Sequence, residues 1–317
     1  MEYTASFISS PIRLWLFLTA LIPSIFCSII VLYHLLSKRT QRRAINNHVI
    51  IILLFNNLIY EFIDIPLLLN FYRLQSVWSA TPSLCVMWMF IDETLNSIST
   101  ILIAWASVER YIIIFRSQWL SSARKRFLIH YLPLMLFVLY IIIFHVIVIL
   151  FSSCINMYDY TREKCGESLC LHNTKLIETW NIIVNEILPG LIIVIFSIAL
   201  LVRCLLQNHR IHQRLQWRKY RKMAIQLLSI SMLYFILYIP VTSIKLVQLC
   251  CISQDGINSF EEYARFFSYY IIFLLPFVCY VSLPEVKWQF KKIFPCCHRQ
   301  ARLIHPRKMP VMHFVTK

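Results

Sequence analysis

Seven long apolar stretches, separated by clusters of charged residues, organise the chain. A helix needs about 20 mostly apolar residues to cross the hydrocarbon core of a membrane, so each stretch predicts a membrane-spanning helix. The predicted spans are 12–36, 48–72, 84–114, 128–152, 179–206, 222–249 and 263–283. Their connections are short, so we expect an all-α membrane protein: a seven-transmembrane helix bundle over 12–283, preceded by a short N-terminus over 1–11.

The composition supports the same class of protein. Hydrophobic residues make up 59% of the chain, charged residues 15%, and the mean hydropathy is +0.65. Soluble domains have about 45–50% apolar and 25% charged residues. The first apolar stretch exceeds the roughly 7–15 residues of a signal peptide, and no basic residue precedes it in 1–11. We therefore expect a true first span.

The basic residues predict how the bundle is oriented. Most of the 31 lysines and arginines follow the first, third, fifth and seventh predicted spans. Loops rich in lysine and arginine face the cytoplasm, so we expect an extracellular N-terminus and a cytoplasmic C-terminus in the plasma membrane. Anionic lipid headgroups account for the formal net charge of +16 at about 1 kcal/mol per residue near the membrane. No nucleic-acid partner is expected.

The segment after the seventh span alternates apolar residues with lysines. Residues 284–297 therefore predict an amphipathic helix in the membrane interface, followed by a basic cytoplasmic tail over 298–317. Cys296 and Cys297 at the end of this helix are candidates for lipidation. A plain solvated basic tail is the alternative.

Four cysteines fall on the predicted outer side: Cys85, Cys154, Cys165 and Cys170. The extracellular side is oxidising and favours disulfides. A bridge from Cys85 to the second outer loop would hold that loop over the mouth of the bundle. We expect Cys85 to pair with Cys170, the loop cysteine closest to the fifth span, which leaves Cys154 for Cys165.

The third predicted span carries Cys85 at its outer end and the triplet Glu109-Arg110-Tyr111 at its inner end. Cys85 and Arg110 are 25 residues apart, about 37 Å of helix, so they mark opposite membrane faces. Seven spans with this cysteine and this triplet resemble the rhodopsin-like (class A) G protein-coupled receptors. Further landmarks of that family are Asn47, Pro66, Pro189, Pro240 and Pro276.

The resemblance implies a receptor that binds an extracellular ligand within the bundle and activates a heterotrimeric G protein, without enzymatic activity or a cofactor. In the family, the acid of the triplet restrains the arginine at rest. Glu109 is therefore implied as the restraint, Arg110 as the switch and Tyr111 as its neighbour. The remaining residues implied in the switch are Tyr238, Pro240 and Pro276.

The chain also departs from the family pattern. Leu275 precedes Pro276 where an asparagine is usual, and Asn57 stands in the second span where an acid is expected. The sodium pocket of the family thereby loses its charged ligand, although Ser99 remains in place. We expect weak sodium sensitivity.

Asp92 lies two turns below Cys85, where amine receptors of the family carry the aspartate that pairs with the ammonium of the ligand. A carboxylate inside a membrane bundle is costly unless it faces a cavity or a partner, so it indicates a functional role. Tyr269 matches the tyrosine that closes over that aspartate. The expected ligand is a small cationic molecule or a short peptide. Further candidate contacts are Glu93, Asn96, Asn181, Tyr238, Thr242 and Lys245.

Several alternatives stay open. Val241 and Thr242 replace the aromatic pair with which amine receptors complete their cation cage. Asp92 could also pair with Lys245 or another internal cation as a structural ion pair. An opsin is disfavoured, because Tyr269 stands where retinal needs a lysine. A transporter or channel is the rival class, but such proteins typically show repeats and Gly/Pro-broken helices. The chain has three glycines and no repeat that we detect.

Overall fold

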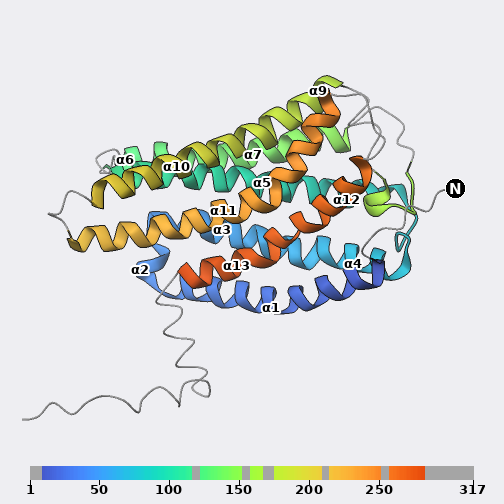
Figure 1. Ribbon diagram of the computed structural model, residues 1–317, viewed down its shortest axis with the longest axis horizontal. Helices are drawn as coiled ribbons and strands as arrows, with labels where there is room; N and C mark the ends of the chain where they lie inside the picture. Colours follow the sequence, from blue (N-terminus) through green and yellow to red (C-terminus); the bar gives the residue numbers. More distant parts are fainter. Residues whose placement is uncertain are drawn as a thin grey trace, which may run out of the picture.

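The computed structural model describes residues 9–115, 122–151, 158–166, 175–208, 214–250 and 257–282. Seven helical segments are long and apolar enough to cross a membrane, and they lie together in one bundle (Figure 1). The part of the chain that the structure describes contains helices and no strand. The predicted seven-helix fold is thus confirmed.

The spans follow the predicted order. The first span is α1 (Ser10–Ser37). The second consists of α3 (Ile45–Ile59), η1 (Tyr60–Asp64) and α4 (Ile65–Leu74). The third is α5 (Pro82–Phe115). The fourth consists of α6 (Ala123–Arg126), η3 (Phe127–Tyr131), α7 (Leu132–His145) and η4 (Val146–Leu150). The fifth consists of α9 (Lys175–Trp180), η6 (Asn181–Ile187) and α10 (Leu188–Asn208). The sixth is α11 (Arg214–Cys250). The seventh consists of α12 (Ile257–Ser268) and α13 (Tyr270–Ser282). Two short helices lie in loops: α2 (Arg39–Arg42) and η5 (Glu163–Cys165).

The sixth helix is longer than its apolar stretch. We expected a span over 222–249, whereas α11 already begins at Arg214. The added residues are rich in arginine, lysine and glutamine, which end a hydrophobic stretch but are good helix formers. The hydrophobic pattern therefore marks the membrane crossing and misses the helical extension beyond it.

Prolines shape several of the spans. A wide π-helical turn lies just before Pro66 (η1), before Pro133 (η3) and before Pro189 (η6). Proline has no N–H and its ring clashes with the carbonyl four residues earlier, and a wider turn accommodates both effects. Pro240 lies inside α11, and Figure 1 shows that the ribbon of α11 changes direction in this second half.

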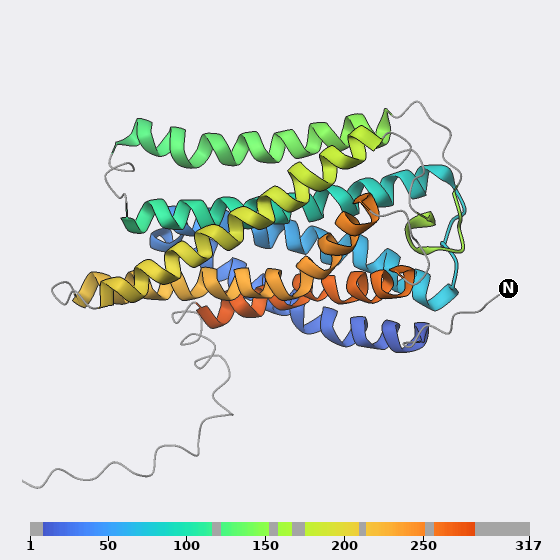
Figure 2. The ribbon, with the colours of Figure 1, turned by 45° about the horizontal axis from the view of Figure 1, so that its top comes forward.

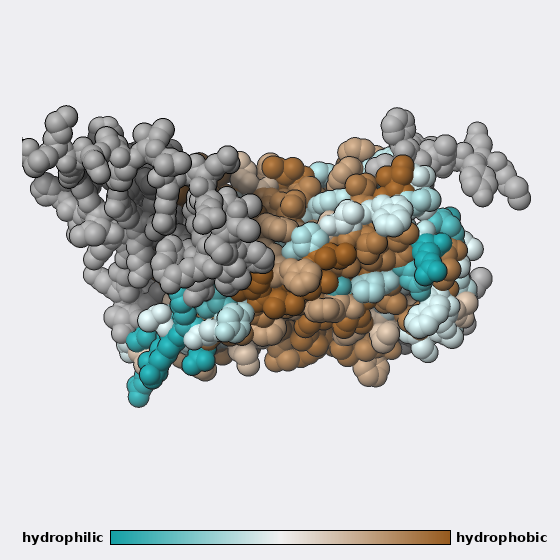
Figure 3. Space-filling view, turned by 90° about the horizontal axis from the view of Figure 1, so that it is seen from below, coloured by the Kyte–Doolittle hydropathy of each residue, from teal (hydrophilic) through white to brown (hydrophobic). Residues whose placement is uncertain are grey.

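The third span forms the centre of the bundle. Helix α5 packs against α3, α7, α10 and α11, while α1 packs against α3, α4 and α13 (Figures 1 and 2). Apolar residues cover the middle of the face in Figure 3, and hydrophilic residues gather at both ends of the long axis, as expected for helices that face lipid. We call the end at Cys85 the disulfide end and the end at Glu109 the triplet end.

A disulfide joins Cys85 to Cys165, whose Cα atoms are 5.7 Å apart. The predicted bonds Cys85–Cys170 and Cys154–Cys165 are therefore wrong. Backbone hydrogen bonds explain the choice of Cys165: Val77 N–H donates to Tyr160 O at 3.0 Å. This contact places the second outer loop beside the loop that precedes α5, which brings Cys165 close to Cys85. Cys154 and Cys170 lie outside the described residues.

The segment after α13 also lies outside the described residues. The interfacial helix over 284–297, the basic tail over 298–317 and the lipidation candidates Cys296 and Cys297 therefore stay predictions. The same holds for the orientation of the termini.

Candidate functional site

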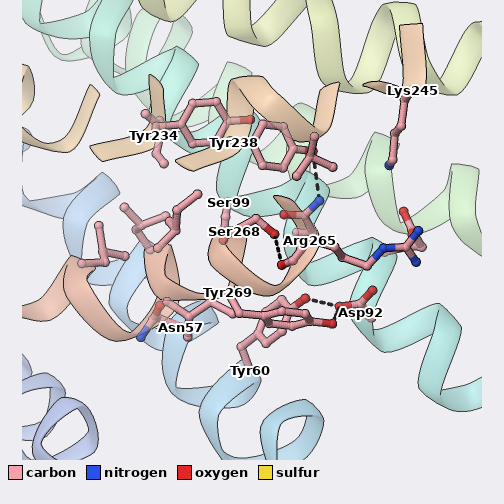
Figure 4. Close-up of a pocket in the computed structure, with 18 of the residues that line it drawn as sticks. Asn57, Tyr60, Asp92, Ser99, Tyr234, Tyr238, Lys245, Arg265, Ser268 and Tyr269 are labelled. Atoms are coloured by element: carbon pink, nitrogen blue, oxygen red, sulfur yellow. Dashed lines mark hydrogen bonds between the residues drawn. The ribbon is translucent and has the colours of Figure 1, made fainter. Parts of the chain in front are cut away.

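A cavity lies between the second, third, sixth and seventh spans (Figure 4). The side chain of Lys164, from the loop helix η5, contributes to its lining. Six of the predicted ligand contacts line this cavity: Asp92, Glu93, Asn96, Tyr238, Lys245 and Tyr269. The structure thus brings together residues of α5 and α11 with Tyr269, which lies between α12 and α13, as the sequence predicted. Their role in ligand binding stays a prediction.

The carboxylate of Asp92 is satisfied by neighbouring side chains. It is 4% exposed, accepts a hydrogen bond from the Tyr60 hydroxyl, and lies 3.4 Å from the hydroxyl oxygen of Tyr269. Figure 4 shows both tyrosines directed at Asp92. The third partner is Lys164, whose ammonium forms an ion pair with Asp92. Buried charges are stable when they are paired and hydrogen-bonded in this way.

The backbone of η5 directs Lys164 into the bundle. Lys164 (φ 53°) and Cys165 (φ 61°) both adopt the left-handed conformation, which is uncommon and costly for residues other than glycine. The Lys164 Nζ atom lies 5.7 Å from the ring centre of Tyr269. Burial opposes the charged form of Lys164, but the carboxylates of Asp92 and Glu93 outweigh it, so the pKa of Lys164 lies above its usual value.

The other cations of the cavity have partners of their own. Lys245 forms an ion pair with Glu186, with 2.6 Å between Nζ and Oε1, and is therefore not the internal cation that pairs with Asp92. Arg265 forms an ion pair with Glu261. Glu93 is half-buried and lines the cavity, and no described residue forms a hydrogen bond or an ion pair with it. One carboxylate thus remains open to a ligand.

Hydroxyl and amide groups link the cavity to the middle of the bundle. The Asn96 side-chain amide donates to the Tyr238 hydroxyl at 3.0 Å, and the rings of Tyr238 and Tyr234 are 4.6 Å apart. The Tyr234 hydroxyl donates to Thr100 Oγ1 at 2.9 Å. We call these four residues the tyrosine ladder, which connects α5 with the part of α11 before Pro240.

Two predicted ligand contacts lie away from the cavity lining. Asn181 Oδ1 accepts a hydrogen bond from the Asn185 amide at 2.8 Å, and Asn185 in turn accepts one from the Tyr140 hydroxyl at 3.1 Å. The Thr242 hydroxyl donates to Ile239 O at 3.0 Å, within its own helix. In this structure both residues serve contacts within the bundle.

Polar groups of the second and third spans, including the lining residues Asn57 and Ser99, also have protein partners. The Asn57 amide donates to Glu61 Oε1 at 3.0 Å, and the Asn56 amide donates to Ser99 Oγ at 2.8 Å. Glu61 is fully buried and also accepts a hydrogen bond from the Ser24 hydroxyl. Glu61 was not predicted from the sequence, because its partner Ser24 comes from a different span. Weak sodium sensitivity stays a prediction.

At the triplet end, the acid of the triplet meets a histidine. Glu109 Oε1 lies 2.7 Å from His130 Nδ1, and both side chains are almost fully buried. His130 Nε2 lies 3.0 Å from His48 Nδ1, and His48 Nε2 lies 2.8 Å from Arg42 O. Arg110 beside them is 3% exposed. This histidine pair was missed from the sequence, since its members are 82 residues apart.

Tyr111 completes the triplet on the side of the fifth span. Its ring lies 5.6 Å from the ring of Phe196 and 5.1 Å from that of Phe115. Such aromatic contacts hold the end of α5 against α10. Among the described residues, no group of three histidines, cysteines or acids could hold a metal ion.

Comparisons with known proteins agree with the seven-helix fold. The crystal structure of squid rhodopsin is similar, with a TM-score of 0.69 and 15% sequence identity over 91% of this chain and 87% of that chain. At this identity, the similarity shows the fold alone. Comparison with curated protein sequences finds no significant match. The model of the family described as "7 transmembrane receptor (rhodopsin family)" matches residues 28–278, which is most of the chain. The chain therefore belongs to the rhodopsin family of seven-transmembrane receptors.

Proposed function

We propose that this receptor lies in the plasma membrane, binds a positively charged extracellular ligand in its cavity and activates a heterotrimeric G protein. In this proposal the disulfide end faces the outside and the triplet end faces the cytoplasm. The observation that carries the ligand class is Glu93, the one carboxylate of the cavity lining without a described partner. A small amine and a short basic peptide both offer the cation that would pair with it.

The tyrosine ladder supports a route from the cavity to the triplet end. A ligand at Glu93 lies one helical turn from Asn96, whose amide bonds to Tyr238 on α11. Binding that alters this contact favours a state in which the sixth helix swings outward about Pro240, so that the part of α11 before Pro240 moves away from the bundle at the triplet end. Arg110 and the basic segment over 203–222 would then meet the G protein together.

Glu93→Gln should lower the potency of a cationic agonist about tenfold, the lower end of the roughly 1.5–3 kcal/mol of a charged hydrogen bond, because the side chain is half-buried. The experiment screens biogenic amines and basic peptides for G protein activation in cells that express the receptor. It then compares the potency of the active compound on the wild type and on the variant.

Asp159→Asn is the matched control, since this exposed loop carboxylate pairs with Arg162 outside the cavity. Its agonist potency should equal that of the wild type. If Glu93→Gln also leaves the potency unchanged while the protein reaches the surface, Glu93 does not receive the cation of the ligand.

His130→Phe should raise basal nucleotide exchange roughly tenfold, the shift that corresponds to about 1.4 kcal/mol of lost restraint on the resting state. The phenyl ring fills the buried space but leaves Glu109 without the histidine 2.7 Å away. The measurement is the exchange rate without agonist in membranes that hold equal amounts of receptor.

His145→Phe is the matched control for this experiment. His145 is a buried histidine in the same span as His130. It lies at the end of α7, 15 residues further along the chain than His130, and so away from Glu109. Its basal rate should stay at the wild-type value. An unchanged rate in His130→Phe would show that the Glu109–His130 contact does not restrain the resting state.

A further inference from the structure

The surroundings of the Lys164 ammonium form a complete site for a primary ammonium ion. The Asp92 carboxylate supplies the counter-charge, and the Tyr269 ring lies 5.7 Å from Nζ. The Tyr60 hydroxyl donates to the same carboxylate and fixes its position. A carboxylate and an aromatic ring together are the groups that hold alkylammonium ligands in proteins. Here the ammonium belongs to the protein itself.

The loop holds Lys164 in this site from both sides. Glu163, on one side, lies 3.8 Å from Arg13 of α1, which also pairs with Glu262 at 2.5 Å. Cys165, on the other side, is bonded to Cys85 of α5. The lysine is thus presented to Asp92 as an intramolecular ligand, whose effective concentration is in the millimolar range or above for a short tether.

An external cation at Asp92 would have to displace this lysine. The displaced ammonium would lose its contact with Asp92 although only 13% of its side chain is exposed. A buried ammonium that loses its counter-charge is strongly destabilised. Glu93 carries no such cost, because no described residue pairs with it. Glu93 is therefore a less costly partner than Asp92 for the positive charge of a ligand.

We propose that Lys164 is a built-in ligand of the Asp92 site, a tethered primary ammonium that excludes external amines from Asp92 and leaves Glu93 to receive the cation of the ligand. The part that concerns the external ligand rests on the proposed function. The ion pair between Lys164 and Asp92 does not depend on the proposed function. Once the lysine side chain is removed, the site at Asp92 should accept an alkylammonium ion of about the length of a lysine side chain.

The test is chemical rescue of the full-length receptor in lipid nanodiscs, followed by thermal unfolding. Lys164→Ala should lower the Tm, because Asp92 stays buried without its counter-charge. Titration with n-butylammonium chloride should raise the Tm of Lys164→Ala in a saturable manner. It should not do so for the wild type, where the site is filled, or for the double variant Lys164→Ala/Asp92→Asn, where the counter-charge is absent.

Two controls make the test specific. Sodium chloride at the same concentration accounts for ionic strength, and n-butanol accounts for the apolar chain. Arg162→Ala removes an exposed cation two residues away, whose side chain is 77% exposed, and should leave the Tm and the butylammonium response at wild-type values. The proposal is overturned if folded Lys164→Ala does not respond, or if the wild type responds equally.

A double-mutant cycle covers the case in which Lys164→Ala does not fold. Lys164→Met keeps most of the side-chain volume and removes the charge. Lys164→Met and Asp92→Asn should each lower the Tm. The Tm of the combined variant should fall by less than the sum of the two single losses. Additive losses would overturn the proposal. Neither G protein nor agonist enters these measurements, so their outcome is separate from that of the proposed function.

Discussion

Arg110→Ala should abolish agonist-stimulated nucleotide exchange and leave ligand binding intact. Arg110 is 3% exposed at the triplet end of α5, on the same helix as Glu93 but 17 residues further along. That separation corresponds to about 26 Å of helix, so the substitution does not reach the cavity. The measurement compares exchange on the G protein with agonist binding in the same membranes.

Two further variants define what Arg110 contributes. Arg110→Lys keeps the charge but not the planar guanidinium with its five donors, so it should retain only part of the exchange activity. Arg126→Ala removes an exposed arginine at the same end, in α6, and should behave as the wild type. Full exchange in Arg110→Ala, at normal surface expression, would contradict the assignment of this residue as the switch.

Cys165→Ser should reduce the amount of folded receptor at the surface more than any other loop substitution. The disulfide joins residues 80 positions apart, and loss of a native disulfide typically costs about 2–5 kcal/mol. It also removes one of the two attachments that place Lys164 at Asp92. Surface expression and the Tm of the purified protein would both fall.

The pairing can be tested with the same substitution at other cysteines. Cys85→Ser and the double variant Cys85→Ser/Cys165→Ser should match Cys165→Ser, since each removes the same bond. Cys27→Ser should have little effect, because Cys27 is a free thiol in α1. If Cys170→Ser rather than Cys165→Ser destabilised the receptor, the bond between Cys85 and Cys165 would be contradicted.

The number and order of the spans were predictable because lipid imposes a minimum length of apolar helix on each crossing. The same argument could not locate the start of α11 at Arg214, since a helix can continue into water with polar residues. The π-helical turn before Pro66 was not predicted either, although the proline itself was noted. Local geometry around a proline depends on how neighbouring helices satisfy the backbone.

Part of the site was predictable because α5 places every third or fourth residue on one face. Asp92, Glu93 and Asn96 meet in the cavity for this reason. The partner of Asp92 was not predictable, because it depends on the left-handed backbone of Lys164 in a loop. His130 was missed for a similar reason: its contact with Glu109 depends on how the third and fourth spans pack.

The most direct test of G protein activation by this receptor is nucleotide exchange by purified components. The receptor is reconstituted in lipid nanodiscs and mixed with each of a panel of purified heterotrimeric G proteins, and binding of a GTP analogue is followed over time. At least one G protein should exchange faster than with empty nanodiscs, and faster still with the cationic agonist. Rates equal to those of empty nanodiscs with every G protein, for a receptor shown to be folded, would contradict the proposal that this receptor activates a heterotrimeric G protein.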